Sequence, residues 1–326
     1  MTSVLPVVCA FDQNLCVPAK VTFCTLKHHV SNDTQLCIYV LHSDSGLPEA
    51  ARLDLMSGFP AEERHSLQFI DVGDAFSHSF QIRGITPPTY YRLLLPSLPI
   101  PFDRILYLDV DIAVVDYIDS VLRTELNGAY LGGVRGIFTT INPERIRSIG
   151  ADPDEYVNAG VLLMDLRRMR ADNLQKDFVD IARQELEFQD QDVLNIRCKG
   201  RISHLHPQYN VHCMFDYEQQ QNLSDTLWRR DCWQDAVLNP TVLHYAGEKP
   251  WNGSKCFYYD VWWKWYHQSS AADREFYLSH QRQRLKIQVA RETPAARPAP
   301  GLCERVGRRC DLLLKKIQSR CWNKLR

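Results

Sequence analysis

The chain has 326 residues, of which 45% are hydrophobic and 24% are charged, and its formal net charge at pH 7 is −1. The hydrophobic fraction excludes a largely disordered chain, and the balanced charge predicts no nucleic-acid partner. The eleven cysteines form no Cys-x-x-Cys pair, so a structural zinc site has little support.

The N-terminal residues "MTSVLPVVCAFDQN" have no basic region followed by a long apolar core. We interpret them as a first strand and not as a signal peptide. No apolar run in the chain reaches the ~18 residues of a membrane span. Together with cysteines that lie within apolar runs, these features predict a protein of the reducing cytoplasm.

Strands and helices are expected to alternate along the first part of the chain. Strands are expected at 4–12, 34–44, 65–73 and 103–115, and helices at 15–29, 47–57 and 90–99, the last stopped by Pro96. Further on, a buried strand follows Asn158, and helices are expected at 173–187 and from the acidic run at 189–192 onward. This alternation predicts an α/β fold with a mostly parallel sheet. Ligands of such sheets bind at the carboxyl ends of the strands, so Asp12, Asp109 and Asp111 are expected to lie close together.

Asp109 and Asp111 interrupt the apolar strand "ILYLDVDIAVV" with one residue between them. In a regular strand these side chains share a face, where two carboxylates repel each other and lose hydration. A Mg²⁺ or Mn²⁺ ion would offset that cost and would also bind the oxygens of a diphosphate. The alternative is a strand-to-turn junction with two solvated aspartates.

Three other segments contain candidate ligand contacts. His244 in "VLHYAGEKPWN" ends an expected strand, as a third metal ligand would, and Gly247 and Lys249 follow as candidate phosphate contacts. Arg92 lies near a helix start in "PPTYYRLLLP", and Asn158 in "YVNAGVLLMDL" precedes two small residues. Each position also has an ordinary explanation, as a core histidine, a surface arginine or a turn-initiating asparagine.

The segment "QDQDVLN" places Asp190 and Gln191 where a helix is expected to begin. These side chains either point into a ligand site or serve as ordinary helix-capping groups. The spacing alone leaves both interpretations open.

Taken in order, these segments resemble glycosyltransferase family 8. They are "AFDQN", "TYYRL", "LYLDVDIAV", "NAGVLLMDL", "FQDQDVLN" and "HYAGEKPW". The resemblance covers about residues 4–255 and is nearest to bacterial lipooligosaccharide and lipopolysaccharide galactosyl- and glucosyltransferases. It implies a Rossmann-like GT-A fold, a nucleotide-sugar donor, Mn²⁺ (or Mg²⁺) as cofactor, and retention of the anomeric configuration.

The resemblance also implies a role for individual residues. The implied metal ligands are Asp109, Asp111 and His244. The implied uracil and ribose contacts are Ala10, Asp12, Asn14 and Val110, and the diphosphate contacts are Gly247 and Lys249. The implied donor-sugar positions are Arg92, Asn158, Ala159, Asp190 and Gln191, the last two being the expected catalytic residues. Tyr91 and Gly136 depart from the family pattern, which leaves the sugar and the acceptor open.

We therefore expect a retaining enzyme that moves galactose or glucose from a UDP-sugar to a saccharide or glycolipid acceptor. Front-face attack, with a leaving phosphate oxygen taking the acceptor proton, is favoured over a double displacement with Asp190 as nucleophile. One alternative is a glycogenin-like self-glucosylating enzyme, which needs an exposed acceptor tyrosine. Another is a non-catalytic sugar-binding protein, which three intact metal ligands disfavour.

The C-terminal segment differs from the rest of the chain. Residues 282–326 contain 13 Lys or Arg and 3 Asp or Glu, and they include a Pro- and Ala-rich linker at 292–301. Apolar residues recur there at helical spacing, at Val306, Cys310, Leu313, Ile317 and Cys321. We predict a catalytic domain at 1–281 and a basic amphipathic helical segment at 282–326. This segment is expected to bind the anionic inner face of the cell membrane peripherally. The alternative is an ordinary amphipathic helix packed on the catalytic domain.

Overall fold

The structure is a computed structural model that describes residues 3–61, 63–82, 86–136, 142–214, 230–253, 256–269 and 276. The chain divides into two units, Met1–His280 and Gln281–Arg326, and every described residue lies in the first. The predicted basic segment and its helix therefore lie outside the described residues. Among the residues described, no helix is long and apolar enough to cross a membrane.

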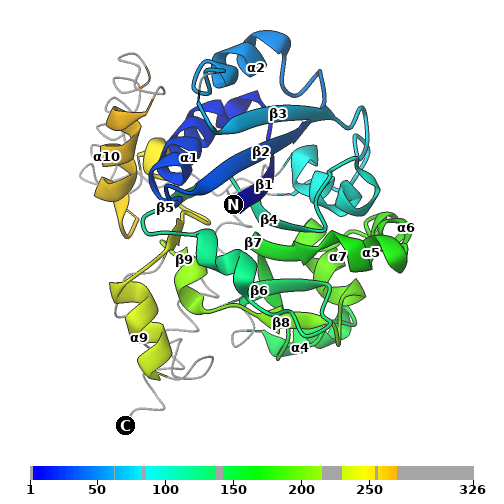
Figure 1. Cartoon of the computed structure of the whole chain (residues 1–326). Coiled ribbons are helices and arrows are strands. Elements are labelled where there is room, and N and C mark those ends of the chain that lie inside the picture. The colour runs from blue at the N-terminus through cyan, green and yellow to red at the C-terminus, as the bar shows by residue number, and fades with distance from the viewer. Residues whose placement is uncertain are drawn as a thin grey trace, which may run out of the picture. The chain divides into compact units, whose positions relative to one another are not determined.

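A seven-stranded sheet forms the centre of the described unit (Figure 1). Its strand order is β3 (Ser66–Asp71), β2 (Thr34–His42), β1 (Ser3–Ala10), β4 (Arg104–Leu108), β7 (Val157–Asp165), β6 (Leu131–Arg135) and β8 (Ile202–His204). The pairs β1–β2, β2–β3, β1–β4 and β6–β8 are parallel, whereas β7 is antiparallel to both neighbours. The prediction of an α/β fold with a mostly parallel sheet is confirmed.

Both faces of this sheet are buried, as the alternate residues of β1 show by packing in two different hydrophobic clusters. In β1, Val7 and Cys9 pack in one cluster with residues of α1 (Cys16–His28) and α2 (Glu49–Met56). Val8 packs in another with residues of α5 (Leu166–Ala171), α6 (Leu174–Ile181) and α7 (Gln189–Arg197). The period of two in a strand therefore explains the nearly continuous apolar runs in the sequence.

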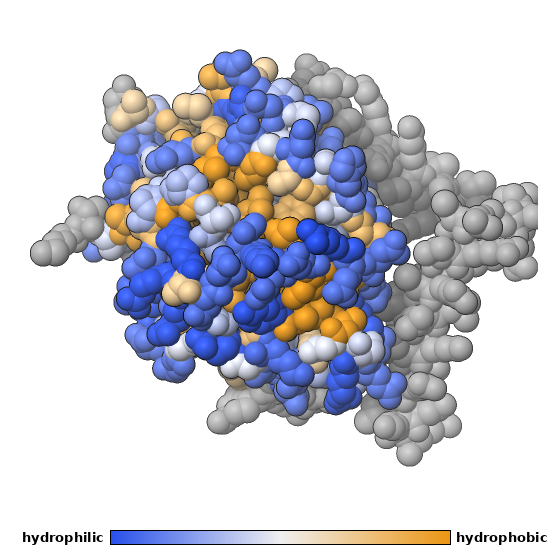
Figure 2. Space-filling model, turned by 90° about the vertical axis from the view of Figure 1, so that its right-hand side faces the viewer, coloured by the Kyte–Doolittle hydropathy of each residue, from blue (hydrophilic) through white to orange (hydrophobic). Residues whose placement is uncertain are grey.

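Helices cover the sheet by burying one apolar face and exposing a polar one. In α6, Leu174 and Phe178 are buried, whereas Lys176 and Asp180 are exposed. Figure 2 shows the side of the molecule that carries α5 and α6 in Figure 1. Hydrophilic residues cover most of this face, and hydrophobic residues reach the surface in a band between them.

A second sheet of three short strands consists of β5 (Ile112–Val114), β10 (Val242–His244) and β9 (Val211–His212). The prediction of one interrupted strand at 103–115 is therefore wrong in one respect, since β4 and β5 belong to different sheets. Asp109, Val110 and Asp111 form the connection between them. Buried tryptophans of α10 (Tyr259–Gln268), with residues of α9 (Arg230–Leu238), pack against the second sheet.

Two predicted helices differ from those in the structure. The segment expected at 90–99 is a 3-10 helix, η2 (Pro87–Ser97), which contains Pro96. It has Pro at its first positions and another inside, and proline donates no backbone hydrogen bond. The helix expected at 173–187 ends at Ile181. The remaining elements are α4 (Pro143–Ser148), η1 (Gln13–Leu15), η3 (Asp119–Arg123), η4 (Pro207–Tyr209) and η5 (Pro250–Asn252).

Candidate active site

Asp109, Asp111 and His244 meet where the two sheets join. Asp109 follows the last residue of β4, and Asp111 precedes β5, whose Ile112 pairs with His244 at the end of β10. His244 Nε2 lies 3.4 Å from Asp111 Oδ1 and 4.0 Å from Asp109 Oδ2. One ligand atom from each residue lies within 4.8 Å of the others. The three side chains thus converge because the chain leaves one sheet for the other between the two aspartates.

This donor set fits a divalent cation. Asp111 Oδ1 is buried and has no hydrogen-bond partner among the described residues, an arrangement that costs free energy unless another group binds the oxygen. Burial alone would raise the pKa of Asp111, but Lys249 and His244 outweigh it and hold that pKa well below its usual range. Two carboxylates and an imidazole are ligands suited to Mn²⁺ or a similar ion. The carboxylate is therefore ionised and available as a ligand.

Arg92 links this set to the start of α7. Its guanidinium lies 2.8 Å from Asp109 Oδ1 and 2.9 Å from Asp190 Oδ2, and it donates at 2.5 Å to the carbonyl of Ala159. The group also lies 4.2 Å from the centre of the Tyr107 ring. Burial alone would lower the pKa of Arg92, but Asp109 and Asp190 outweigh it and raise that pKa. Arg92 is 4% exposed and is therefore a fixed internal cation, not the surface arginine of the alternative interpretation.

Asp190 is a buried carboxylate in the first turn of α7. Its Oδ1 accepts a 2.5 Å hydrogen bond from the Thr89 hydroxyl. Burial raises its pKa to about 6, against the opposing effects of Arg92 and Thr89. The capping hydrogen bond at this helix end comes from Asp192 instead, whose Oδ2 accepts from the Phe188 backbone N–H at 2.9 Å. The acidic run thus contains one structural carboxylate and one that joins the Arg92 cluster.

Gln191 is held through both ends of its amide. Its Oε1 accepts from Asn158 Nδ2 at 3.0 Å and from the Ala159 backbone N–H at 3.1 Å. Its Nε2 donates to the Tyr156 hydroxyl at 3.0 Å, which in turn donates to Asp192 Oδ1 at 2.5 Å. The structure therefore brings Arg92, Asn158, Ala159, Asp190 and Gln191 into one hydrogen-bonded group.

The sequence-predicted nucleotide contacts lie at two places. Asp12, just beyond the end of β1 at Ala10, accepts hydrogen bonds from the Asn14 backbone N–H (2.9 Å) and the Thr86 hydroxyl (2.8 Å). Val110, between the two aspartates, is 2% exposed, and its carbonyl accepts from Thr22. The first position is at the same sheet edge as Asp109, because β1 and β4 are parallel neighbours.

The second place is the turn after β10. Gly247 is exposed with φ of +86°, a conformation that favours glycine. Lys249 donates to Asp111 Oδ2 and, at 2.8 Å, to the carbonyl of Tyr245. An ammonium group therefore lies directly beside the candidate metal ligands.

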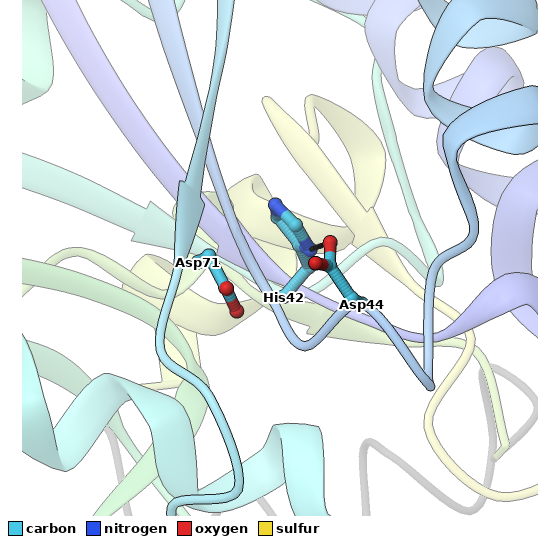
Figure 3. Close-up of side chains that lie close together, drawn as sticks. All are labelled: His42, Asp44 and Asp71. Carbon is cyan, nitrogen blue, oxygen red and sulfur yellow. Dashed lines mark ion pairs between the residues drawn. The ribbon is translucent and has the colours of Figure 1, made fainter.

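A second group of acids and histidine lies at the ends of β2 and β3. Figure 3 shows Asp44 beside His42, with Asp71 extending from the neighbouring strand. Arg52 of α2 ion-pairs with Asp44, and its Nη1 lies 3.3 Å from His42 Nδ1. Asp44 is 71% exposed, so water and a guanidinium already compensate its charge. Unlike the group of Asp109, Asp111 and His244, this group has no buried carboxylate oxygen without a hydrogen-bond partner among its three described residues.

Several residues of the site were not predicted from the sequence. They are Thr89, Arg145, Tyr156, Asp192 and Asn210. Arg145 binds Asp192 through two nitrogens, and Asn210 lies between His244 and Asn158. Asp192, Thr89 and Tyr156 lie within segments that the sequence singled out, whereas Arg145 and Asn210 lie outside them. Their partners come from elements far apart in the chain, so local patterns do not predict these contacts.

Comparisons with known proteins identify the family to which the chain is similar. Residues 6–255 match the family described as Glycosyl transferase family 8. Glycosyltransferase GlyE of Streptococcus pneumoniae is 28% identical over 203 residues, which are 60% of this chain and 45% of that protein. Lipopolysaccharide 1,2-glucosyltransferase of Escherichia coli K12 is 29% identical over 174 residues, covering 50% and 48% of the two chains. The chain thus spans about half the length of the curated relatives it matches.

A solved structure is similar over most of the chain. The galactosyltransferase LgtC, crystallised with donor and acceptor sugar analogues, superimposes with a TM-score of 0.71 at 25% identity. The match covers 83% of this chain and 99% of that one. The site described above thus lies on a scaffold shared with a structurally characterised enzyme.

Proposed function

The chain belongs to glycosyltransferase family 8 and has the GT-A fold, and from this premise we propose that it is a retaining hexosyltransferase. It transfers galactose or glucose from a UDP-sugar to a saccharide acceptor of lipopolysaccharide or lipooligosaccharide type. The names of the glucosyltransferase and galactosyltransferase relatives support these sugars and this acceptor class. The observation that carries the proposal is the set of Asp109, Asp111 and His244 with its orphaned buried oxygen.

The proposed metal is Mn²⁺, with Mg²⁺ as the alternative, held by the two aspartates and His244. When bound, such an ion neutralises the charge of a diphosphate and makes UDP a good leaving group. Lys249, adjacent to Asp111, supplies a second positive charge for the diphosphate, and Gly247 allows close backbone approach. Ala10, Asp12, Asn14 and Val110 are proposed to hold uracil and ribose.

Arg92, Asn158, Ala159, Asp190 and Gln191 are proposed to surround the transferred sugar. Both oxygens of Asp190 already accept hydrogen bonds, from Thr89 and Arg92, and the Gln191 oxygen accepts two. The two bonds occupy both lone pairs of the Gln191 oxygen, and the ion pair with Arg92 weakens Asp190 as a nucleophile, which favours front-face attack over a covalent intermediate. The acceptor oxygen bonds to the anomeric carbon on the face that UDP leaves, and its proton passes to the leaving phosphate oxygen. Asp190 stabilises the positive charge at the anomeric carbon.

Asp111→Asn tests the proposal. The variant should remain folded, lose Mn²⁺ binding in the presence of UDP, and lose nearly all sugar transfer at saturating donor. Mn²⁺ affinity is measured by electron paramagnetic resonance and turnover by UDP release. Asp44→Asn, in the second acidic group, is the matched control and should change neither quantity. Wild-type turnover of Asp111→Asn after metal stripping would contradict the assignment.

A donor screen identifies the sugar and separates the alternatives. UDP-galactose, UDP-glucose and UDP-N-acetylhexosamines are each incubated with Mn²⁺, and slow hydrolysis without acceptor is measured. Hydrolysis of one hexose donor is expected. Donor binding without UDP release would indicate a sugar-binding protein, and a mass increase of the protein by whole hexoses would indicate self-glucosylation.

A further inference from the structure

Asn210 is a buried amide between the candidate metal ligands and the candidate sugar site. It follows η4, precedes β9, and is 3% exposed. Its side chain lies 2.8 Å from His244 Nδ1 on one side and 2.8 Å from Asn158 Oδ1 on the other. We propose that Asn210 is a positioning residue that sets the tautomer of His244 and orients the Asn158–Gln191 pair. This inference rests on the proposed function for its metal and sugar.

The orientation of the Asn210 amide follows from a backbone group. The Gly160 N–H donates to Asn158 Oδ1 at 2.9 Å, and because a backbone N–H can only donate, the accepting atom must be oxygen. The Asn210 atom that faces this oxygen must then be the donor, Nδ2. Its other atom, Oδ1, faces His244.

The tautomer of His244 follows from that orientation. Since Asn210 Oδ1 can only accept, His244 Nδ1 must carry the hydrogen that joins them. In a neutral imidazole the lone pair is then on Nε2, the nitrogen that lies nearest Asp111 and Asp109. A metal-binding histidine needs this arrangement, in which the partner of one nitrogen fixes the other as the ligand.

The chain of hydrogen bonds continues in one direction towards α7. The Ala159 backbone N–H fixes Gln191 Oε1 as an acceptor, so Asn158 Nδ2 donates to the same oxygen. Gln191 Nε2 then donates to the Tyr156 hydroxyl, which donates to Asp192, an anion paired with Arg145. Every donor from His244 to Asp192 points the same way, and such chains strengthen their members cooperatively.

Asn210 therefore has two separable effects, and two substitutions distinguish them. Asn210→Leu removes both hydrogen bonds at similar size, whereas Asn210→Asp keeps an acceptor for His244 Nδ1 and loses the donor to Asn158. Asn210→Leu should lower Mn²⁺ affinity, with UDP present, by roughly 10- to 100-fold, as loss of a histidine's supporting hydrogen bond does. Asn210→Asp should keep Mn²⁺ affinity much closer to wild type yet lower kcat at saturating Mn²⁺ and donor.

A matched control removes a buried amide that does not contact His244. Asn195 is 2% exposed and bonds to the backbone of Val157 and Gln191. Asn195→Leu should lower the unfolding temperature without changing Mn²⁺ affinity. Equal loss of Mn²⁺ affinity in Asn195→Leu and Asn210→Leu would overturn the proposal, as would unchanged Mn²⁺ affinity in Asn210→Leu.

A measurement on the unmodified protein does not depend on whether the variants fold. Long-range ¹H–¹⁵N correlation spectra of the metal-free protein, at a pH where its histidines are neutral, report which nitrogen of His244 is protonated. A His244→Gln sample identifies the signals. Protonated Nδ1 is expected, and protonated Nε2 would overturn the proposal. Because neither this spectrum nor Mn²⁺ affinity requires sugar transfer, failure of every donor would contradict the proposed enzyme and leave the effect of Asn210 on His244 standing.

Discussion

Asp190 and Asp111 show how two carboxylates of one site acquire opposite properties. Burial raises the pKa of Asp190 to about 6, with Arg92 opposing it. For Asp111, burial is outweighed chiefly by the adjacent Lys249, which holds the pKa well below its usual range. A carboxylate with a low pKa suits a permanent metal ligand, whereas one that tolerates burial suits contact with a neutral sugar. Both carboxylates lie beside a cation, but burial outweighs Arg92 at Asp190, whereas Lys249 outweighs burial at Asp111.

The raised pKa of Asp190 predicts a pH dependence of stability. The unfolded chain releases this proton near pH 3.8, whereas the folded protein keeps it up to about pH 6. The folded state thus binds the additional proton in this window, so its stability falls as pH rises through it. A pKa difference of this size corresponds to a loss of ~3 kcal/mol in the free energy of unfolding.

Asp190→Asn should remove this dependence. The unfolding free energies of the two metal-free proteins are measured by urea titration between pH 4 and pH 7. Between pH 4 and pH 7, the unfolding free energy of the variant should increase relative to that of wild type by ~3 kcal/mol. Histidines with lowered pKa values, such as His29, His65, His204 and His212, are present in both proteins and cancel in the difference. A difference that is constant with pH would show that Asp190 ionises normally in the fold.

At the scale of the element, β7 must pass unusually close to the metal ligands. A Cβ added to Gly160 would overlap His244 Cε1 and would lie 2.9 Å from His244 Nδ1 and 3.0 Å from Asp109 Oδ2. These are side chains held by other hydrogen bonds, so they cannot move freely. The glycine is therefore required by space and not by backbone conformation.

Gly160→Ala should displace His244 and lower Mn²⁺ affinity by roughly tenfold or more. Gly133→Ala is the control, because its Cβ would also be crowded, 2.9 Å from Val157 Cβ, but against the core and not against the metal ligands. The control should lose ~1–3 kcal/mol of stability through overpacking and keep its Mn²⁺ affinity. Calorimetry of metal binding and thermal unfolding measure the two quantities. Equal Mn²⁺ affinity in both variants would show that the ligands adjust to the added methyl group.

The elements differ in how far the sequence alone predicts them. The strands β1, β2 and β3 follow from apolar runs that end at acids or turn residues, a local signal. The separation of β4 from β5 does not follow, because a strand that changes sheets has the same local pattern as one that continues. Asn210 was not predicted for a related reason, since its partners His244 and Asn158 come from distant strands. Contacts between elements decide both features.

At the scale of the whole molecule, the C-terminal segment 282–326, here called the tail, differs in charge from the rest of the chain. The 13 basic and 3 acidic residues of 282–326 contrast with an acidic body of opposite net charge. All residues of the candidate site lie within the unit Met1–His280. We therefore propose that the catalytic site does not require the tail, which serves instead to bring the enzyme to an anionic membrane carrying a glycolipid acceptor.

A protein truncated after Arg291 tests this division. It should remain folded and hydrolyse donor with Mn²⁺, but it should no longer sediment with anionic phospholipid vesicles. Each basic residue near such a surface contributes roughly 1 kcal/mol to the free energy of membrane binding. Because salt screens this attraction, binding of the full chain should weaken steeply as salt is added. Neutral phosphatidylcholine vesicles control for apolar insertion alone. Full-length protein that ignores anionic vesicles at low salt would refute the membrane role, because electrostatic attraction is strongest there. Unfolding on truncation would instead show that the tail is a structural part of the catalytic domain.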